Sequence, residues 1–264
     1  MLFNSLSFVV FLILVLTLYY SKLFNWTNKK RMLLLASYIF YGMWNPPLVI
    51  LLWISTVVDW TAGKKLAVEE NQQKRKFWLL LSMFVNLGFL AFFKYGDFVL
   101  ENFTTLVNSV GIDFKAQPMD IILPMGISFY TFQTMSYTID MYKRKIKPAR
   151  TFLDFALYVT FFPQLVAGPI VRAKELITQF YEPKRATVNQ FIWGVFLLTI
   201  GLFQKVVMAD TLLSKTADDV FGAGKLLHGV DAWIGTLAFS GQIFFDFAGY
   251  STCAIGIALM LGVI

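Results

Sequence analysis

The sequence predicts an all-α polytopic membrane protein, a bundle of transmembrane helices with broken and re-entrant segments around a polar cavity. Hydrophobic residues make up 57% of the 264-residue chain, whereas a soluble domain has about 45 to 50%. These residues gather in long apolar runs, and most of the 23 Lys and Arg residues lie in short clusters between the runs. Such clusters mark the cytoplasmic ends of membrane helices, so the net charge of +7 indicates topology and no nucleic-acid partner.

The basic clusters also set the direction of each crossing. Apolar run 2–20 has no basic segment before it and a cluster at 22–31 after it, so we expect the N-terminus outside. Segments 94–117 and 210–231 are mainly acidic and are expected to be external loops. The expected membrane segments are 2–20, a bent hairpin over 32–60 with arms of some 12 residues, 77–93, 121–142, 153–172, 191–208 and 233–264.

Segment 153–172 is expected to shape the bundle, because a basic cluster stands on each side of it. Clusters on both sides require the chain to enter and leave the membrane through one face. Interrupted backbone at membrane depth is tolerated only under protein or beside a water-filled cavity, so a cavity should lie next to this segment. The predicted backbone breaks, here and in the other runs, are Pro46, Pro47, Pro163, Gly168, Pro169 and Gly249.

Polar side chains inside the apolar runs are the candidates for lining that cavity, because intramembrane polar groups face a bundle interior or water. Gln133, Tyr137 and Asp140 recur at helical spacing on one face of 123–142. Close helix packing is the alternative for the Ser and Thr residues beside them, and an interfacial position is the alternative for Asp140. The predicted cavity residues are Gln133, Tyr137, Asp140, Gln164, Asp246 and Tyr250.

Two of these candidates have specific structural alternatives. Asp246 is the only charged residue between 233 and 264, and Tyr250 lies one turn away, within reach of a hydrogen bond. Asp246 serves either as a proton relay or substrate contact, or as the cap of a helix starting near Gly249. Gln164 either contacts substrate or satisfies the backbone groups that Pro163 frees.

Several catalytic chemistries are not favoured by this sequence. His228 is the only histidine and lies in the acidic 210–231 segment, so we expect a solvated loop residue. Cys253 is the only cysteine and lies in an apolar run, which is typical of a small core residue. Without a cluster of either residue type no metal site is predicted. No phosphate-binding glycine motif is present either.

Four stretches of the chain resemble the membrane-bound O-acyltransferase family. The similarity runs the whole length of the chain, and within the family it is strongest to the bacterial branch of the alginate O-acetyltransferase membrane protein and the D-alanyl transfer protein of teichoic acid synthesis. Each motif alone is weak, whereas the four in order are specific. The motifs are YGMWNP at 41–46, LPMGISFYTFQ at 123–133, DFALY at 154–158 with FPQLVAGPI at 162–170, and FDFAGY at 245–250.

This resemblance implies a multi-pass enzyme of the bacterial cytoplasmic (inner) membrane. The implied donor substrate is an acyl thioester, acetyl-CoA or an acyl carrier protein, with no bound cofactor. The implied partners are membrane lipid, the acyl donor, and an extracytoplasmic acyltransferase or an acceptor polysaccharide. The family's catalytic histidine follows the FDFAGY motif in a Trp-His context, so we expect it downstream of Ile264 and assign no catalytic residue here.

The expected organisation is one transmembrane domain over 1–264, the N-terminal portion of a longer acyltransferase domain and inactive by itself. The last arm, 252–264, is short for a crossing and lacks a basic residue. A transporter or lipid-handling protein is the first alternative, although internal repeats that would support it are absent from the sequence. A non-catalytic remnant or assembly partner is the second alternative.

Overall fold

The computed structural model describes residues 2–115, 117, 121–166, 168–222 and 228–264, and these residues form helices and connecting segments without strands. Helix length and spacing follow the apolar runs of the sequence. The elements are α1 (Leu6–Tyr20), α2 (Trp26–Gly42), the 3₁₀ helix η1 (Pro46–Leu48), α3 (Val49–Val68), α4 (Gln72–Ser109), α5 (Ile127–Tyr142), α6 (Phe152–Thr160), α7 (Ala173–Gln179), α8 (Val188–Leu202), the π-helix η2 (Phe203–Leu213), α9 (Ser214–Phe221) and α10 (Gly229–Met260).

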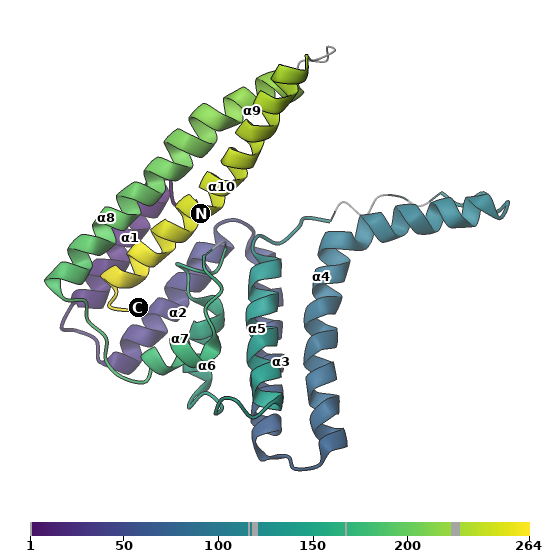
Figure 1. Cartoon of the computed structure of the whole chain (residues 1–264). Coiled ribbons are helices and arrows are strands. Elements are labelled where there is room, and N and C mark those ends of the chain that lie inside the picture. The colour runs from purple at the N-terminus through teal and green to yellow at the C-terminus, as the bar shows by residue number, and fades with distance from the viewer. Residues whose placement is uncertain (1, 116, 118–120, 167, 223–227) are drawn as a thin grey trace.

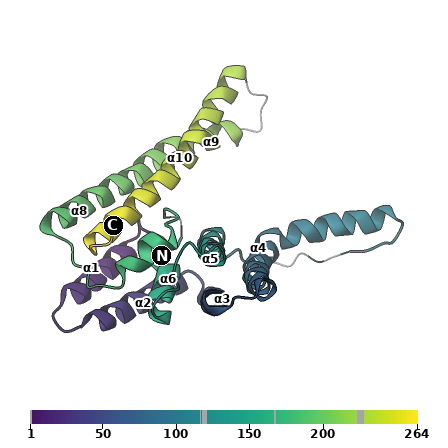
Figure 2. The ribbon, with the colours of Figure 1, turned by 60° about the horizontal axis from the view of Figure 1, so that its bottom comes forward.

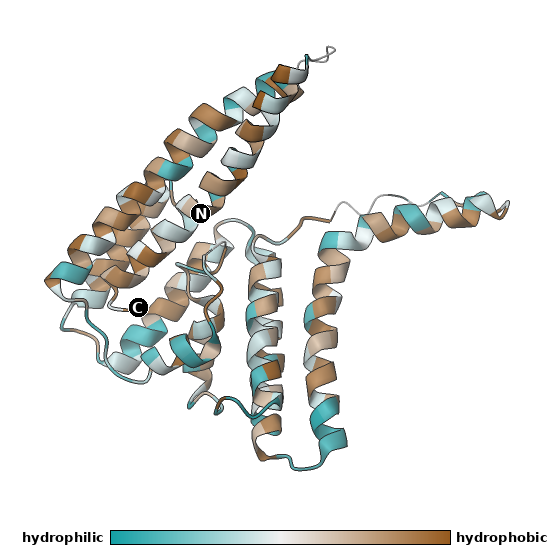
Figure 3. Ribbon diagram, in the orientation of Figure 1, coloured by the Kyte–Doolittle hydropathy of each residue, from teal (hydrophilic) through white to brown (hydrophobic). Residues whose placement is uncertain are grey.

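The predicted all-α membrane fold is confirmed. Among the described residues, four helical stretches are long and apolar enough to cross a bilayer, and α1 is a shorter apolar helix. Figure 3 shows hydrophobic residues along much of α8 and of the part of α4 that lies beside α3 and α5. The four stretches are Pro46–Val68, Gln72–Ser109, Val188–Phe221 and Gly229–Met260.

The helices form two groups that lie side by side. Helices α2, α3, α5, α6 and α7 pack on one another, and α4 lies against α3 and α5 (Figure 1). The continuous helix α8–η2–α9 forms a long hairpin with α10, and Figure 2 shows this hairpin from a second direction with α1 next to it. The Tyr19 hydroxyl of α1 lies 2.8 Å from the Lys184 carbonyl oxygen and 2.9 Å from that of Leu261. Helix α1 therefore joins the end of α10 to the segment before α8.

Two helices continue through segments that were predicted to be external loops. Helix α4 extends to Ser109 and turns away from the bundle partway along its length (Figure 1), although 94–117 was expected to be a loop. The helix that begins with α8 extends to Phe221, although 210–231 was expected to be a loop. Neither segment contains proline, and each helix ends just before a glycine, Gly111 or Gly222. Acidic side chains alone do not stop a helix. Residues 223–227 of the second predicted loop lie outside the described residues.

The expected bend at Pro46 and Pro47 coincides with η1, where both prolines occupy the first turn. The two arms are longer than the predicted 12 residues, because α2 has 17 residues and α3 has 20. Helix α2 begins at Trp26, and so it includes the basic cluster around Lys30 that the sequence assigned to a loop.

The predicted break at Gly249 is wrong, because α10 passes through this residue without interruption. A Cβ atom at Gly249 would stand 2.8 Å from the Gly201 carbonyl oxygen and 2.8 Å from the Lys205 amide nitrogen. The absence of a side chain at Gly249 therefore lets α10 approach the backbone of the α8–η2 helix. Small residues serve the same purpose at many interfaces between membrane helices.

Candidate functional site at the broken helix

Helix α6 is a short buried helix that begins with a side-chain cap. The hydroxyl of Thr151 accepts a hydrogen bond from the Asp154 amide and donates one of 2.7 Å to the Asp154 carboxylate. Every residue from Asp154 to Thr160 is buried. A carboxylate in the first turn also interacts favourably with the helix dipole. The cap therefore fixes the point at which the chain turns into the bundle.

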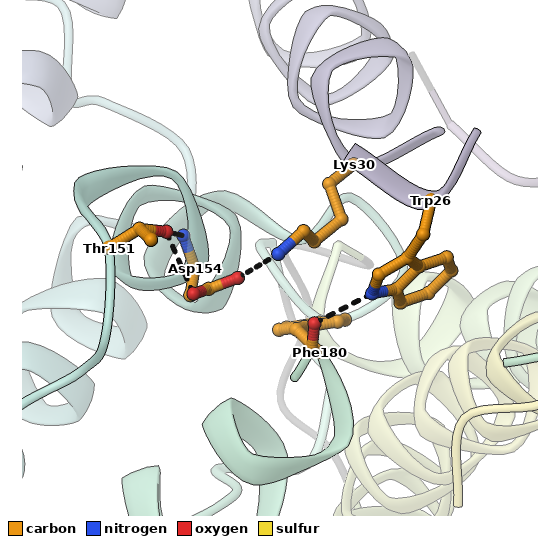
Figure 4. A network of polar contacts seen from close by, with 5 residues as sticks. All are labelled: Trp26, Lys30, Thr151, Asp154 and Phe180. Atoms are coloured by element: carbon orange, nitrogen blue, oxygen red, sulfur yellow. Dashed lines mark hydrogen bonds and ion pairs between the residues drawn. The ribbon is translucent and has the colours of Figure 1, made fainter. Parts of the chain in front are cut away.

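A buried ion pair holds this first turn against α2, as Figure 4 shows. The Lys30 ammonium group donates a hydrogen bond to Asp154 Oδ1, and both side chains are almost inaccessible to solvent. Four residues before Lys30, the Trp26 indole nitrogen donates to the carbonyl of Phe180, just after α7. The entrance of the broken element at Asp154 and its exit at Phe180 thus both lie beside the first turns of α2. The chain enters and leaves the bundle at the same end.

Backbone groups at the end of α6 are bonded by side chains from α2, α5 and the turn that follows α6. The Tyr158 carbonyl oxygen accepts hydrogen bonds from the Gln133 amide at 2.8 Å and from the Gln164 amide at 3.0 Å. Ser37 Oγ accepts a hydrogen bond of 3.1 Å from the Phe162 amide. These contacts replace the helical bonds that are lost where α6 stops before Pro163. Gln164 thus bonds a backbone group at the end of α6, the carbonyl of Tyr158, whereas the group that Pro163 itself frees is the carbonyl of Val159.

Two glycines allow the broken segment to pack closely. Gly126, at the N-terminus of α5, has φ of +73° and would bring a Cβ atom within 2.6 Å of the Leu165 carbonyl oxygen. A Cβ atom at Gly168 would overlap the backbone of Gln164. Glycine is therefore required where α5 meets the turn and where the turn folds back on itself.

A small pocket lies between this turn and the end of α10. Its volume is about 130 Å³, and most of its lining side chains are apolar. A cavity beside the broken segment was predicted, but this pocket is not the polar cavity that was expected. It is lined by Phe161, Pro163, Gln164, Pro169, Val171, Leu176, Ala254, Ile255, Ala258, Leu259, Val263 and Ile264.

Of the six predicted cavity residues, Gln164 is the one that lines this pocket. Gln133 is buried behind it on α5, and its side-chain nitrogen bonds the Tyr158 carbonyl. Tyr137 is fully buried, with its ring centroid 4.6 Å from that of Phe155. Asp140 lies two residues before the end of α5 and is half-buried. Gln133 and Gln164 are thus brought together, whereas Tyr137 and Asp140 lie elsewhere on α5.

The other two predicted residues lie on α10, away from the broken segment. Asp246 is exposed and forms an ion pair of 2.6 Å with Lys205, which also pairs with Asp210 at 2.8 Å. It caps no helix start, because α10 is continuous there. The ring of Tyr250 stacks on Phe3 at 4.1 Å, and its buried hydroxyl has no hydrogen-bond partner among the described residues. The expected hydrogen bond between Tyr250 and Asp246 is therefore absent.

Neither the histidine nor the cysteine lines the pocket. His228 is exposed and immediately precedes α10, at the end opposite to the pocket. Cys253 is buried between α10 and α8, with its sulfur 3.6 Å from the Leu198 carbonyl oxygen. In the part of the chain that the structure describes, no group of His, Cys, Asp and Glu side chains could hold a metal ion.

Sequence analysis missed the ion pair between Lys30 and Asp154. Lys30 had been assigned to a cytoplasmic cluster, and Asp154 had appeared only as part of a motif. The one available signal was an acidic residue three positions after Thr151, which is a helix-start pattern. Asp59, a buried carboxyl group of α3, was also not predicted.

Comparison with known proteins supports the resemblance seen in the motifs. Residues 145–264 match the model of the membrane-bound O-acyltransferase family. The chain is 38% identical to a probable alginate O-acetylase of Pseudomonas aeruginosa over 99% of its own length and 50% of that protein. It is 35% identical to a peptidoglycan O-acetyltransferase of Helicobacter pylori, over 89% of the chain and 48% of that protein.

A more distant match is the teichoic acid D-alanyltransferase of Lacticaseibacillus rhamnosus, 28% identical over 53% of the chain and 36% of that protein. The chain spans about half the length of the relatives that match it along nearly all its residues. By these matches, which include the broken helix and α10, the chain belongs to the membrane-bound O-acyltransferase family.

Proposed function

We propose that this chain is the scaffold part of a membrane O-acyltransferase, which moves an acyl group from a cytoplasmic thioester to a hydroxyl of a cell-surface polysaccharide. The observation that carries the proposal is the broken α6–α7 element, which enters and leaves beside the start of α2 and leaves a pocket at its turn. Relatives that match nearly the whole chain are named as O-acetylating proteins of alginate or peptidoglycan. An acetyl group is therefore the proposed acyl group.

We propose that the acyl donor approaches the helix bundle from the end at which the basic segments lie. The Tyr19 hydroxyl bridges the Lys184 and Leu261 carbonyl oxygens, so the end of α10 and its pocket lie close to basic segment 172–185. The anionic part of coenzyme A, or of an acyl carrier protein, is attracted to such a segment. The apolar pocket would receive the uncharged end of the thioester.

The acceptor side and the cellular location follow from the same orientation. We propose a multi-pass protein of the bacterial inner membrane with its N-terminus outside, so that the basic segments face the cytoplasm. The acyl group would then leave on the outer side, to an acceptor polysaccharide directly or through an extracytoplasmic acyltransferase. Residues 1–264 would act as one transmembrane domain within a longer acyltransferase domain.

The 264-residue chain is proposed to be inactive alone. A general base of suitable pKa is needed at the acceptor hydroxyl, and histidine most often has this role. His228 is the only histidine of the sequence. It stands 26 positions before Ala254, so the helical rise separates it from the pocket by roughly 40 Å. The catalytic histidine is therefore proposed to come from another segment of the complete enzyme.

A fusion experiment tests this function. The chain is expressed alone and fused to the second half of the Pseudomonas aeruginosa relative, and membranes are supplied with labelled acetyl-CoA and alginate. We expect transfer by the fusion and none by the chain alone. Ala258→Phe, which fills the pocket, should reduce transfer more than tenfold, whereas Ser240→Phe on the exposed face of α10 should not. Transfer by the chain alone, or equal activity of the two variants, would contradict the proposal.

A further inference from the structure

Asp59 is a fully buried carboxyl group in the middle of an apolar helix. It lies on α3, within a membrane-spanning stretch, and its side chain is inaccessible to solvent. Helices α3, α4 and α5 pack side by side around it (Figure 1). The hydrogen-bond partners that the structure gives it are Ser82 and Asn86 of α4, both of which are uncharged. An isolated carboxylate in such a place carries a large desolvation cost.

The orientation of the Asn86 side-chain amide follows from its contact with a carbonyl oxygen, which can only accept a hydrogen bond. Its amide nitrogen donates to the Ser82 carbonyl oxygen at 2.9 Å, and a carbonyl oxygen can only accept. The same nitrogen lies 2.9 Å from Asp59 Oδ2 and 3.0 Å from Oδ1. Its amide oxygen accepts from Ser55 at 2.5 Å and from Thr134 at 3.2 Å. Asn86 therefore donates to both oxygens of the Asp59 carboxyl group.

The hydroxyl groups next to Asp59 are uncharged as well. Oδ1 lies 2.5 Å from Ser82 Oγ, which lies 3.1 Å from Thr138 Oγ1, which in turn lies 3.2 Å from the Thr134 carbonyl oxygen. Ser82 donates to Asp59, and Thr138 donates to the Thr134 carbonyl oxygen. Both hydroxyl groups are neutral, so neither supplies a positive charge to the carboxyl group.

The charged groups of the neighbouring elements do not neutralise Asp59. On α4, the Arg75 guanidinium is held by the carbonyl oxygens of Leu66, Met141 and Tyr142. Lys30 of α2 and Asp154 of α6 pair with each other. On α5, Tyr137 lies near enough to interact electrostatically with Asp59 but brings no positive charge, and Asp140 brings a negative one. Only a proton remains to compensate the carboxylate.

We propose that Asp59 is a proton-binding site that holds α3, α4 and α5 together in its neutral form. Nothing in the proposed acyl transfer requires this group, so the proposal stands independently of that function. In the unfolded chain the carboxyl group is ionised above about pH 4. The folded chain therefore binds one more proton than the unfolded chain, and stability falls as the pH rises. Loss of the proton would leave a charge inside the three-helix unit.

The test compares Asp59→Asn with Asp59→Ala in reversible unfolding by detergent over a range of pH. Asparagine can donate to Ser82 and accept from Asn86, so it reproduces the protonated acid. We expect Asp59→Asn to be at least as stable as the unmodified chain at neutral pH. Relative to this variant, the folding equilibrium constant of the unmodified chain should fall about tenfold per pH unit above pH 5, until the folded carboxyl ionises. Asp59→Ala should be less stable at every pH.

An infrared measurement reports the proton directly. The unmodified chain should show the carbonyl stretching band of a protonated carboxyl group at neutral pH, and Asp59→Asn should remove it. Asp113→Asn, at an exposed aspartate, is the matched control and should change neither the band nor the pH dependence. The proposal is overturned if the band is absent, or if Asp59→Asn destabilises the chain as much as Asp59→Ala with no dependence on pH.

Discussion

Lys30 of α2 and Asp154 of α6 form a buried ion pair between residues that are 124 positions apart in the sequence. The pair fixes the first turn of the broken helix to the bundle. Since Trp26 bonds the segment after α7 one helical turn away, the same end of α2 holds both ends of the broken element.

Removing one partner of this pair should strongly destabilise the chain. Lys30→Met leaves the Asp154 carboxylate buried without its cation, which costs about 3 to 5 kcal/mol. The double variant Lys30→Met with Asp154→Leu removes both charges and should recover part of this loss. The measurement is detergent-induced unfolding.

Lys74→Met is the matched control, because Lys74 is exposed and forms a weak ion pair. Its ammonium nitrogen lies 4.0 Å from the Glu69 carboxylate. A pair of this kind contributes about 0 to 1 kcal/mol. If Lys30→Met and Lys74→Met had equal effects, the buried pair would have no special part in holding α6.

The two amides that share the Tyr158 carbonyl should not act additively. Gln164→Leu leaves Gln133 as a donor to this oxygen, so we expect a loss of about 1 kcal/mol. Removing both amides leaves the buried carbonyl without these donors and should cost more than the two single losses combined. A double-mutant cycle in unfolding experiments measures the difference. Strict additivity would show that the two bonds are independent.

Gly249→Ala should separate α10 from the α8–η2 helix. Its Cβ atom would meet backbone atoms of Gly201 and Lys205 at 2.8 Å, and backbone cannot move aside as a flexible side chain does. Overpacking of this kind costs about 1 to 3 kcal/mol.

Gly88→Ala on α4 is the control, because nothing lies within 4 Å of the added Cβ atom. Alanine there should stabilise the helix by up to about 1 kcal/mol. If Gly249→Ala were equally stabilising, the close approach of α10 to the α8–η2 helix would be disproved.

Much of the fold could be predicted from the sequence, because apolar runs and proline positions are local signals. The bend at Pro46 and Pro47 and the interruption near Pro163 both coincide with ends of helices. Gly249 shows the limit of such signals. In a sequence, a glycine that breaks a helix cannot be distinguished from a glycine at a contact between helices. The structure shows that Gly249 faces Gly201 on the neighbouring helix, and so it is of the second kind.

The residues of the site were harder to predict, because their partners are remote in the sequence. Gln133 and Gln164 were selected as polar groups in apolar surroundings, and the shared acceptor is a backbone carbonyl that no sequence pattern marks. Lys30 was assigned to the basic cluster at 22–31, which was taken to mark the cytoplasmic side of the membrane. Asp59 was overlooked inside an apolar run, since its partners Ser82 and Asn86 lie on the next helix.

The most direct test of the account is the side of the membrane to which the two ends of the broken element are exposed. In a Cys253→Ala background, Lys147→Cys precedes the element, Lys184→Cys follows it, and Gly111→Cys lies beyond α4. Each variant is labelled with a membrane-impermeant maleimide in intact cells and in inverted vesicles. We predict that the first two react only in inverted vesicles and that Gly111→Cys reacts only in intact cells. Labelling of Lys147→Cys and Lys184→Cys from opposite sides would show that the element crosses the membrane, which would contradict the proposed site.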